Sequence, residues 1–181
     1  MENKIERVMI FIDGSNFYHG LKKDVGNLDI DFKKFTELLT GSRKLVGVYY
    51  YNAPLDRIAD PERYRKQQQF FEKLKKIPNF NVILVRMQKR KIGDKIYYVV
   101  KGDDINIAVD MVMLAQSNSY DTAVLVSGDG DFVPAVKAVQ TFGKHVENYY
   151  FKTGHSWHLR QACDKSVLMN KELIEKCLEL R

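Results

Sequence analysis

The feature that most constrains the fold is the alternation of short apolar runs with longer amphipathic segments. Such alternation is typical of βαβ units around a mainly parallel sheet, so it predicts an α/β fold. Five runs have the length and composition of strands: 8–12, 45–51, 81–87, 123–127 and 145–150. Helical patterns separate most of them, at 16–22, 31–39, 61–77 and 103–116, and two shorter ones follow at 155–162 and 171–180.

The segment 86–102 follows a different pattern. Gly93 and Asp94 form a turn signal between the runs 87–92 and 95–100, which predicts an inserted β-hairpin. The strongest basic cluster of the chain surrounds this turn, and we expect it to contact phosphates. A strand with one solvated basic face would show the same pattern. The cluster consists of Arg86, Lys89, Arg90, Lys91 and Lys95.

Composition narrows the classes of partner and compartment. The chain has 29 Lys and Arg against 23 Asp and Glu, a net charge of +6, which favours anionic partners such as nucleic acid. No apolar run approaches the roughly 20 residues needed to span a bilayer, and the N-terminus lacks the apolar core of a signal peptide. We therefore expect a cytoplasmic protein without a membrane partner, in which Cys163 and Cys177 are reduced thiols.

Two apolar runs end in acidic residues. Asp13 follows the first run in FIDGSN, and Asp129 and Asp131 follow a later one in VSGDGD. In open α/β sheets ligands bind at the carboxyl ends of the strands, where the strand order reverses. If the two strands are neighbours, their aspartates converge at that edge.

A third stretch, KGDDINIAVD, supplies further acids. Asp103 and Asp104 begin a predicted helix, and Asp110 lies within an apolar run of that helix. Because a buried, unpaired carboxylate is costly, Asp110 is expected to point toward the acidic cluster or to pair with a base such as Lys101. The apolar residues expected to share one face of this helix are Ile105, Ala108, Val109, Val112 and Met113.

Converging carboxylates favour a hard divalent cation. They repel one another unless a cation or proton neutralises them, and Mg²⁺ or Mn²⁺ prefers such oxygen ligands, whereas zinc prefers Cys and His. A phosphoester is the substrate that fits this chemistry. Taken singly, Asp13, Asp104 and Asp131 are also ordinary helix caps, and Ser15 and Asn16 could do no more than satisfy backbone donors.

Taken together, the stretches FIDGSNFY, KGDDINIAVDMV and VSGDGDFVPAV resemble the NYN domain family, in particular its LabA-like branch within the PIN-like group of metal-dependent nucleases. The resemblance covers about residues 7–151. The length of the chain favours a single domain over residues 1–181, with a C-terminal helical segment at 152–181. The resemblance implies that this domain is a Rossmann-like α/β/α sandwich. It also implies cleavage of RNA assisted by Mg²⁺ or Mn²⁺.

The resemblance assigns roles to residues of the three stretches. Asp13 and Asn16 match the acid after the first strand and its polar companion, Asp104 matches the acid of a lysine-glycine-x-acid motif, and Asp129 and Asp131 match the later paired acids. These five are the expected catalytic residues, and the four aspartates among them are the expected metal ligands. Residues expected to act around the ligands are Asp103, Asp110 and Ser127. Residues expected to bind substrate are Lys101, which the resemblance places near the site, and Arg86, Lys89, Arg90 and Lys91, which belong to the basic cluster of the hairpin.

The function predicted is hydrolysis of RNA phosphodiester bonds by a metal-dependent endoribonuclease. Two alternatives remain: a non-catalytic RNA- or protein-binding regulatory module that retains the acidic site, and a metal-dependent phosphatase or nucleotide hydrolase. Enzymes of the second kind that form an aspartyl-phosphate usually carry D-x-D after the first strand, whereas Ser15 stands at that position here. The aromatic content also allows a homodimer, for which the sequence locates no interface.

Overall fold

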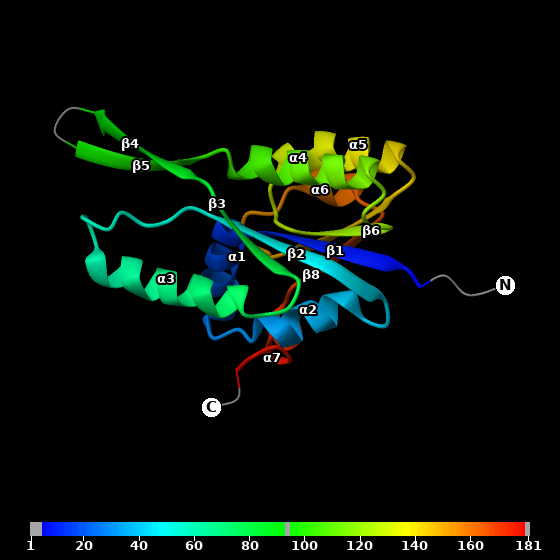
Figure 1. Ribbon diagram of the computed structural model, residues 1–181, viewed down its shortest axis with the longest axis horizontal. Helices are drawn as coiled ribbons and strands as arrows, with labels where there is room; N and C mark the ends of the chain where they lie inside the picture. The colour runs from blue at the N-terminus through cyan, green and yellow to red at the C-terminus, as the bar shows by residue number, and fades with distance from the viewer. Residues whose placement is uncertain (1–4, 93–94, 180–181) are drawn as a thin grey trace.

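The computed structural model describes residues 5–92 and 95–179, and only the backbone of residues 86–92 and 95–101 within them. Its centre is a six-stranded parallel sheet with the strand order β3-β2-β1-β6-β7-β8 (Figure 1). The predicted α/β fold with a mainly parallel sheet is therefore confirmed. The strands of this sheet are β1 (Arg7–Asp13), β2 (Lys44–Asn52), β3 (Phe80–Leu84), β6 (Thr122–Val126), β7 (His145–Tyr150) and β8 (Lys165–Leu168).

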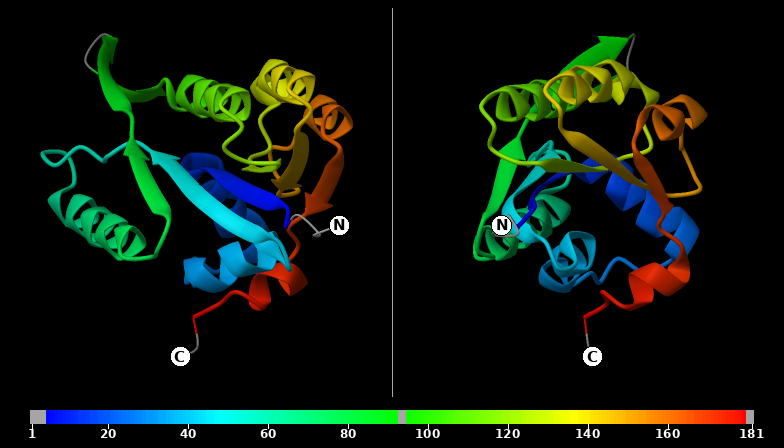
Figure 2. Two further views of the ribbon diagram at one scale, coloured as in Figure 1. Left: turned by 45° about the vertical axis from the view of Figure 1, so that its right-hand side comes forward. Right: turned by 90° about the vertical axis from the view of Figure 1, so that its right-hand side faces the viewer.

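Helices cover both faces of the sheet (Figures 1 and 2). One face carries α1 (Gly14–Gly20), which continues into a π-helical segment (Leu21–Val25), and α2 (Phe32–Thr40), α3 (Pro61–Lys75) and α7 (Lys171–Glu175). The other carries α4 (Asp103–Gln116), α5 (Val133–Thr141) and α6 (Trp157–Ala162). Among the described residues, no helix combines the length and the apolar character that crossing a membrane requires.

The central strand β1 explains why the sheet needs a helical layer on each side. Its alternate residues Val8, Ile10 and Ile12 belong to one apolar cluster, and Met9 and Phe11 belong to the other, all at most 4 % exposed. A strand buried on both faces reads as a continuous apolar run, as observed here in the sequence. The sheet therefore separates two cores, one against each layer of helices.

The predicted hairpin is present between β3 and α4. Its strands β4 (Arg86–Ile92) and β5 (Lys95–Lys101) pair antiparallel, apart from the six-stranded sheet, and extend away from it (Figure 1). The predicted strand 81–87 is divided, because β3 ends at Leu84 and β4 begins at Arg86, with the buried Val85 between them. The predicted turn residues Gly93 and Asp94 lie outside the described residues.

The C-terminal part contains one strand that the sequence pattern did not reveal. The predicted helices 155–162 and 171–180 correspond to the shorter α6 and α7, and β8 lies between them and pairs in parallel with β7. Cys163 and Cys177 are both free thiols, as expected.

The order of the strands fixes the position of the acidic residues. The chain proceeds outward from β1 to β2 and β3, returns to β6 on the other side of β1, and continues outward to β7 and β8. The strand order therefore reverses between β1 and β6, where Ile12 lies opposite Val126. Asp13 and the loop after β6 leave the sheet side by side, at the crevice where open α/β sheets bind ligands.

Candidate active site

Three acidic side chains converge at this crevice. One carboxylate oxygen each from Asp104, Asp129 and Asp131 lies within 4.8 Å of the other two. Asp104 comes from the first turn of α4, while Asp129 and Asp131 belong to the loop and 3₁₀ turn (Gly130–Phe132) after β6. We call these three residues the acid triad. Their spacing brings three hard oxygen donors to one point, which fits a single divalent cation.

The electrostatics of Asp104 support the same conclusion. Burial, followed by the charges of Asp103, Asp13, Asp129 and Asp131, raises its pKa from an ordinary value of 3.8 to about 6. All of these causes act in one direction, because each disfavours the negative charge. A bound cation would relieve this repulsion. The triad contains neither Cys nor His, so its donors suit Mg²⁺ or Mn²⁺ better than zinc.

Asp13 lies beside the acid triad and bridges the two central strands. It is 5 % exposed, its Oδ1 accepts a hydrogen bond from the Asn16 backbone N–H at 3.0 Å, and its Oδ2 accepts one from the Ser127 hydroxyl at 3.0 Å. Burial raises its pKa, and the charges of Asp103 and Asp129 raise it further, while the two hydrogen bonds act against this. Asp13 is thus both the N-cap of α1 and a neighbour of the acid triad.

Asn16 and Ser127 hold the acidic loop in position. The side-chain oxygen of Asn16 accepts a hydrogen bond from the Gly128 backbone N–H at 3.1 Å. The buried Ser127 hydroxyl accepts one from the Asp129 N–H at 3.2 Å, and Asp129 Oδ1 accepts one from the Asp131 N–H at 3.0 Å. This chain of contacts fixes the loop relative to α1, and through it the carboxylate of Asp129.

Two further residues that sequence reasoning missed support the loop from the other side. Asn148 on β7 is fully buried, and its side-chain amide donates to the carbonyl oxygens of Leu125, at 3.2 Å, and Ser127, at 2.8 Å. The Ser156 backbone N–H donates to the Gly128 carbonyl at 2.7 Å. The available signal was an asparagine inside an apolar strand, because a buried amide must find hydrogen-bond partners.

Asp110 has a partner other than those considered from the sequence. The Tyr51 hydroxyl donates a hydrogen bond to Asp110 Oδ2 at 2.7 Å. Burial raises the pKa of Tyr51, and the hydrogen bond to Asp110 raises it further, so the hydroxyl keeps the proton that it donates. The Asp110 carboxylate therefore has a hydrogen-bond donor, but the donor is a tyrosine rather than the expected base.

Replacing Tyr51 with phenylalanine should lower the free energy of unfolding by about 1–2 kcal/mol, because the half-buried Asp110 carboxylate loses its donor. Urea unfolding followed by circular dichroism measures this loss. Asp110→Asn retains an acceptor for the hydroxyl and should cost less. Equal stability of Tyr51→Phe and the wild type would show that this hydrogen bond contributes nothing.

The remaining predicted residues fall into two groups. Asp103 lies in the first turn of α4, half-buried and outside the acid triad, yet near enough for its charge to raise the pKa of both Asp13 and Asp104. The others lie on β4 and β5, where the side chains are outside the described part of the chain, so their role in binding substrate stays a prediction. They are Arg86, Lys89, Arg90, Lys91 and Lys101.

Comparison with known proteins agrees with this geometry. The family model of the NYN domain matches residues 7–170. The chain is 27 % identical over 177 residues to the low amplitude and bright protein LabA of Synechococcus elongatus, covering 94 % of this chain and 88 % of that protein. A crystal structure of a protein of unknown function from Vibrio parahaemolyticus superposes with a TM-score of 0.77 at 26 % identity, covering 99 % of both chains.

The family match covers more of the chain than the resemblance carried by the three motifs. It extends past residue 151 to residue 170, so it includes α6, β8 and the Ser156 contact that supports the acidic loop. All of the acid triad, Asp13 and Asn16 lie inside it. Since the match covers most of the sequence, the chain belongs to the NYN domain family.

Proposed function

We propose that this protein is a metal-dependent endoribonuclease that hydrolyses RNA phosphodiester bonds beside the acid triad. The observation that carries the proposal is the convergence of Asp104, Asp129 and Asp131 at the reversal of strand order. The NYN domain family is nuclease-like, so nucleic acid is the substrate class to which the family points. We further propose that the nucleic acid substrate is RNA rather than DNA.

Mg²⁺ or Mn²⁺ is the cofactor that fits the donors. Asp104, Asp129 and Asp131 would hold it, with Asp13 next to them. The chemistry that such an ion supplies when bound is polarisation of a phosphoryl oxygen and activation of water as the nucleophile. Asp103 adds negative charge close by, which strengthens attraction for a cation.

The other polar residues of the site keep the acids in place. Asp13 orients the Ser127 hydroxyl, and that hydroxyl in turn accepts from the N–H of Asp129. Asn16 ties the start of α1 to the loop at Gly128. Such fixed supports matter because catalysis depends on groups held in their working geometry before substrate arrives.

Phosphates of the RNA away from the cut bond need positive charge. We assign this role to Lys101, which directly precedes the Gly102–Asp103–Asp104 stretch, and to Arg86, Lys89, Arg90 and Lys91 on the hairpin. Each phosphate contact would add to the dependence of affinity on salt concentration.

A cleavage assay tests the proposal. End-labelled single-stranded RNA and DNA of one sequence are incubated with Mg²⁺, with Mn²⁺ or with EDTA. We expect internal cuts in the RNA that need metal and disappear in Asp129→Asn, a change that removes the charge but keeps an acceptor for the Asp131 N–H. Glu37→Gln, an exposed charge change on α2, is the matched control and should cleave like the wild type.

Three results would contradict the proposal. RNA that is bound but never cut would favour a binding module. Release of phosphate from mononucleotides without internal cleavage would favour a phosphatase or nucleotide hydrolase. Full activity of Asp129→Asn would remove the acid triad from the reaction.

A further inference from the structure

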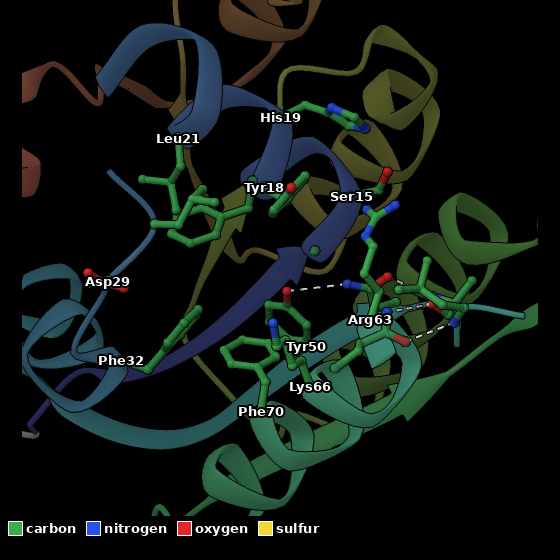
Figure 3. A pocket seen from close by; sticks show the side chains of 17 residues that line it. Ser15, Tyr18, His19, Leu21, Asp29, Phe32, Tyr50, Arg63, Lys66 and Phe70 are labelled. Carbon is green, nitrogen blue, oxygen red and sulfur yellow. Dashed lines mark hydrogen bonds between the residues drawn. The ribbon is translucent and has the colours of Figure 1, made fainter. Parts of the chain in front are cut away.

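We propose that the cavity between α1 and α3 binds one unpaired nucleotide of single-stranded RNA, next to the bond that is cut. The inference rests on the proposed nuclease function and adds a feature of its substrate. The cavity has a volume of about 720 Å³, within the range of about 300–1,000 Å³ typical of small-molecule sites (Figure 3). It is therefore large enough to take a nucleotide rather than only water.

The cavity begins next to Asp13, which itself lies near the acid triad. Gly14 and Ser15 line it, and they directly follow Asp13 in the chain. Tyr50 and Asn52 line it from the end of β2, the strand that neighbours β1. A strand of RNA with its scissile phosphate at the acids could thus place an adjacent nucleotide in the cavity.

Aromatic rings form one wall of the cavity. The ring centroids of Phe32 and Phe70 lie 5.6 Å apart, those of Tyr50 and Phe70 lie 5.9 Å apart, and those of Phe32 and Tyr50 lie 5.8 Å apart. Figure 3 shows these three side chains below α1, from which Tyr18 projects. Phe70 is half-buried and Tyr18 is 38 % exposed, so both offer accessible ring surface. Nucleobases of any sequence stack on such rings.

Charged groups at the cavity suit the rest of a nucleotide. Arg63 and Lys66 on α3 line it with side chains 65 % and 67 % exposed. Their ion pairs within the same helix region, to Asp60 at 3.7 Å and Glu62 at 2.8 Å, are exposed and therefore weak, so a phosphate can compete for both cations. Asp29 also lines the cavity.

The wall of the cavity is held rigidly before any ligand binds. The Gln67 side chain donates to the Ala53 carbonyl at 3.0 Å and accepts from the Leu55 N–H at 2.8 Å, which joins α3 to the loop after β2. The Asn52 side chain donates to the Tyr50 hydroxyl at 3.3 Å and accepts from the Ala53 N–H at 2.8 Å. A preformed cavity loses little entropy when it binds a ligand.

The single-stranded form of RNA follows from the shape of the site. A base inside a duplex is stacked and paired, and it must leave the helix to enter a cavity lined by aromatic side chains. An unpaired base pays no such cost. The cavity should therefore favour single-stranded RNA over a blunt duplex.

Binding of a fluorescently labelled single-stranded RNA, measured by anisotropy in EDTA, tests the cavity without cleavage. We expect the double variant Arg63→Gln/Lys66→Gln to bind about tenfold more weakly, with a reduced dependence on salt. The matched control is Arg65→Gln/Lys75→Gln, which removes the same charge from exposed positions of α3 that do not line the cavity. It should weaken binding less than about twofold, and neither double variant should differ from the other on blunt duplex RNA.

Phe70→Leu tests base stacking separately from charge. It keeps an apolar side chain but removes the ring, and it should weaken single-stranded RNA binding about fivefold or more. Thermal unfolding checks that this variant is folded. Ultraviolet crosslinking of RNA that carries one 4-thiouridine, followed by peptide mapping, should place the crosslink on residues 14–21 or 63–70.

The outcomes separate this inference from the nuclease proposal. Equal weakening by the cavity and control variants, or no weakening by either, would overturn the nucleotide cavity even if the wild type cleaves RNA with metal. Loss of binding confined to the cavity variants would support the nucleotide cavity. If the wild type also failed to cleave any RNA with Mg²⁺ or Mn²⁺, that result would overturn only the nuclease proposal.

Discussion

Replacing Asp104 with asparagine is expected to lower RNA cleavage about a thousandfold, because the acid triad loses one of its three charged donors. The metal-free variant is expected to be at least as stable as the wild type. Burial and four neighbouring carboxylates raise the pKa of Asp104 to about 6, so keeping its negative charge in the folded protein at neutral pH lowers the free energy of unfolding. A neutral side chain removes that repulsion.

The two expectations are measured on the same protein samples. Cleavage is followed as kcat/KM on labelled single-stranded RNA. Thermal unfolding is followed in EDTA and again with Mg²⁺ or Mn²⁺, which should raise the Tm of the wild type because the ion binds only the folded protein. The variant should lose most of this metal-dependent rise.

Asp103→Asn is the matched control for Asp104→Asn. It makes the same change of charge in the same turn of α4, but Asp103 lies outside the acid triad. We expect a loss of cleavage of about tenfold or less and a retained effect of metal on Tm. If Asp104→Asn keeps the metal-dependent rise in Tm of the wild type, Asp104 is not a ligand.

The second large effect is expected from Gly128→Ala, which should lower the free energy of unfolding by about 1–3 kcal/mol and strongly reduce cleavage. A Cβ atom at position 128 would lie 2.6 Å from the Gly154 carbonyl oxygen and 3.0 Å from the His155 Cα. Both neighbours are backbone atoms, so the loop itself must shift. That shift would disturb the hydrogen bonds of Gly128 to Asn16 and Ser156, and with them the position of Asp129.

Urea unfolding and the cleavage assay measure the two effects of Gly128→Ala. Gly47→Ala is the control, because its Cβ would meet only side-chain atoms, the nearest being a ring carbon of Tyr49 at 3.3 Å. We expect it to retain most of the activity. Wild-type stability and cleavage in Gly128→Ala would mean that the contact with residues 154 and 155 does not control the acidic loop.

The sequence predicted that Asp13 and Asp129 lie at strand ends, but it did not predict that the two strand ends are neighbours. Each of Asp13 and Asp129 follows an apolar run, so their position at the ends of strands could be predicted from the local pattern alone. That β1 lies beside β6 depends on how the connections order the sheet, which periodicity does not encode. The convergence could therefore be predicted only on the condition that the strands were neighbours.

The face that α4 buries shows a second limit. The structure buries Ile107, Met111 and Ala115, whereas Ile105, Val109 and Met113, predicted to share an apolar face, are 67 %, 51 % and 58 % exposed. When a helix has apolar residues on all sides, the spacing of those residues does not identify which face is buried. Its orientation is decided by packing against the sheet.

The edge strand β8 was missed for a different reason. Its four residues, KSVL, are partly or fully exposed, so they show neither the apolar run of a central strand nor a long alternation. Asp110 is a comparable case, because its partner Tyr51 is 59 positions away in sequence. Local patterns carry no information about contacts of that range.

The strand reversal between β1 and β6 also governs when the acidic site can form during synthesis of the protein. Asp13 and Ser127 are 114 positions apart, and the chain leaves the ribosome N-terminus first. When β1 and the turn that carries Asp104 have emerged, Asp129 and Asp131 have yet to be exposed. A nascent chain thus holds only part of its acids, and the complete acidic site forms only after β6 has joined the sheet.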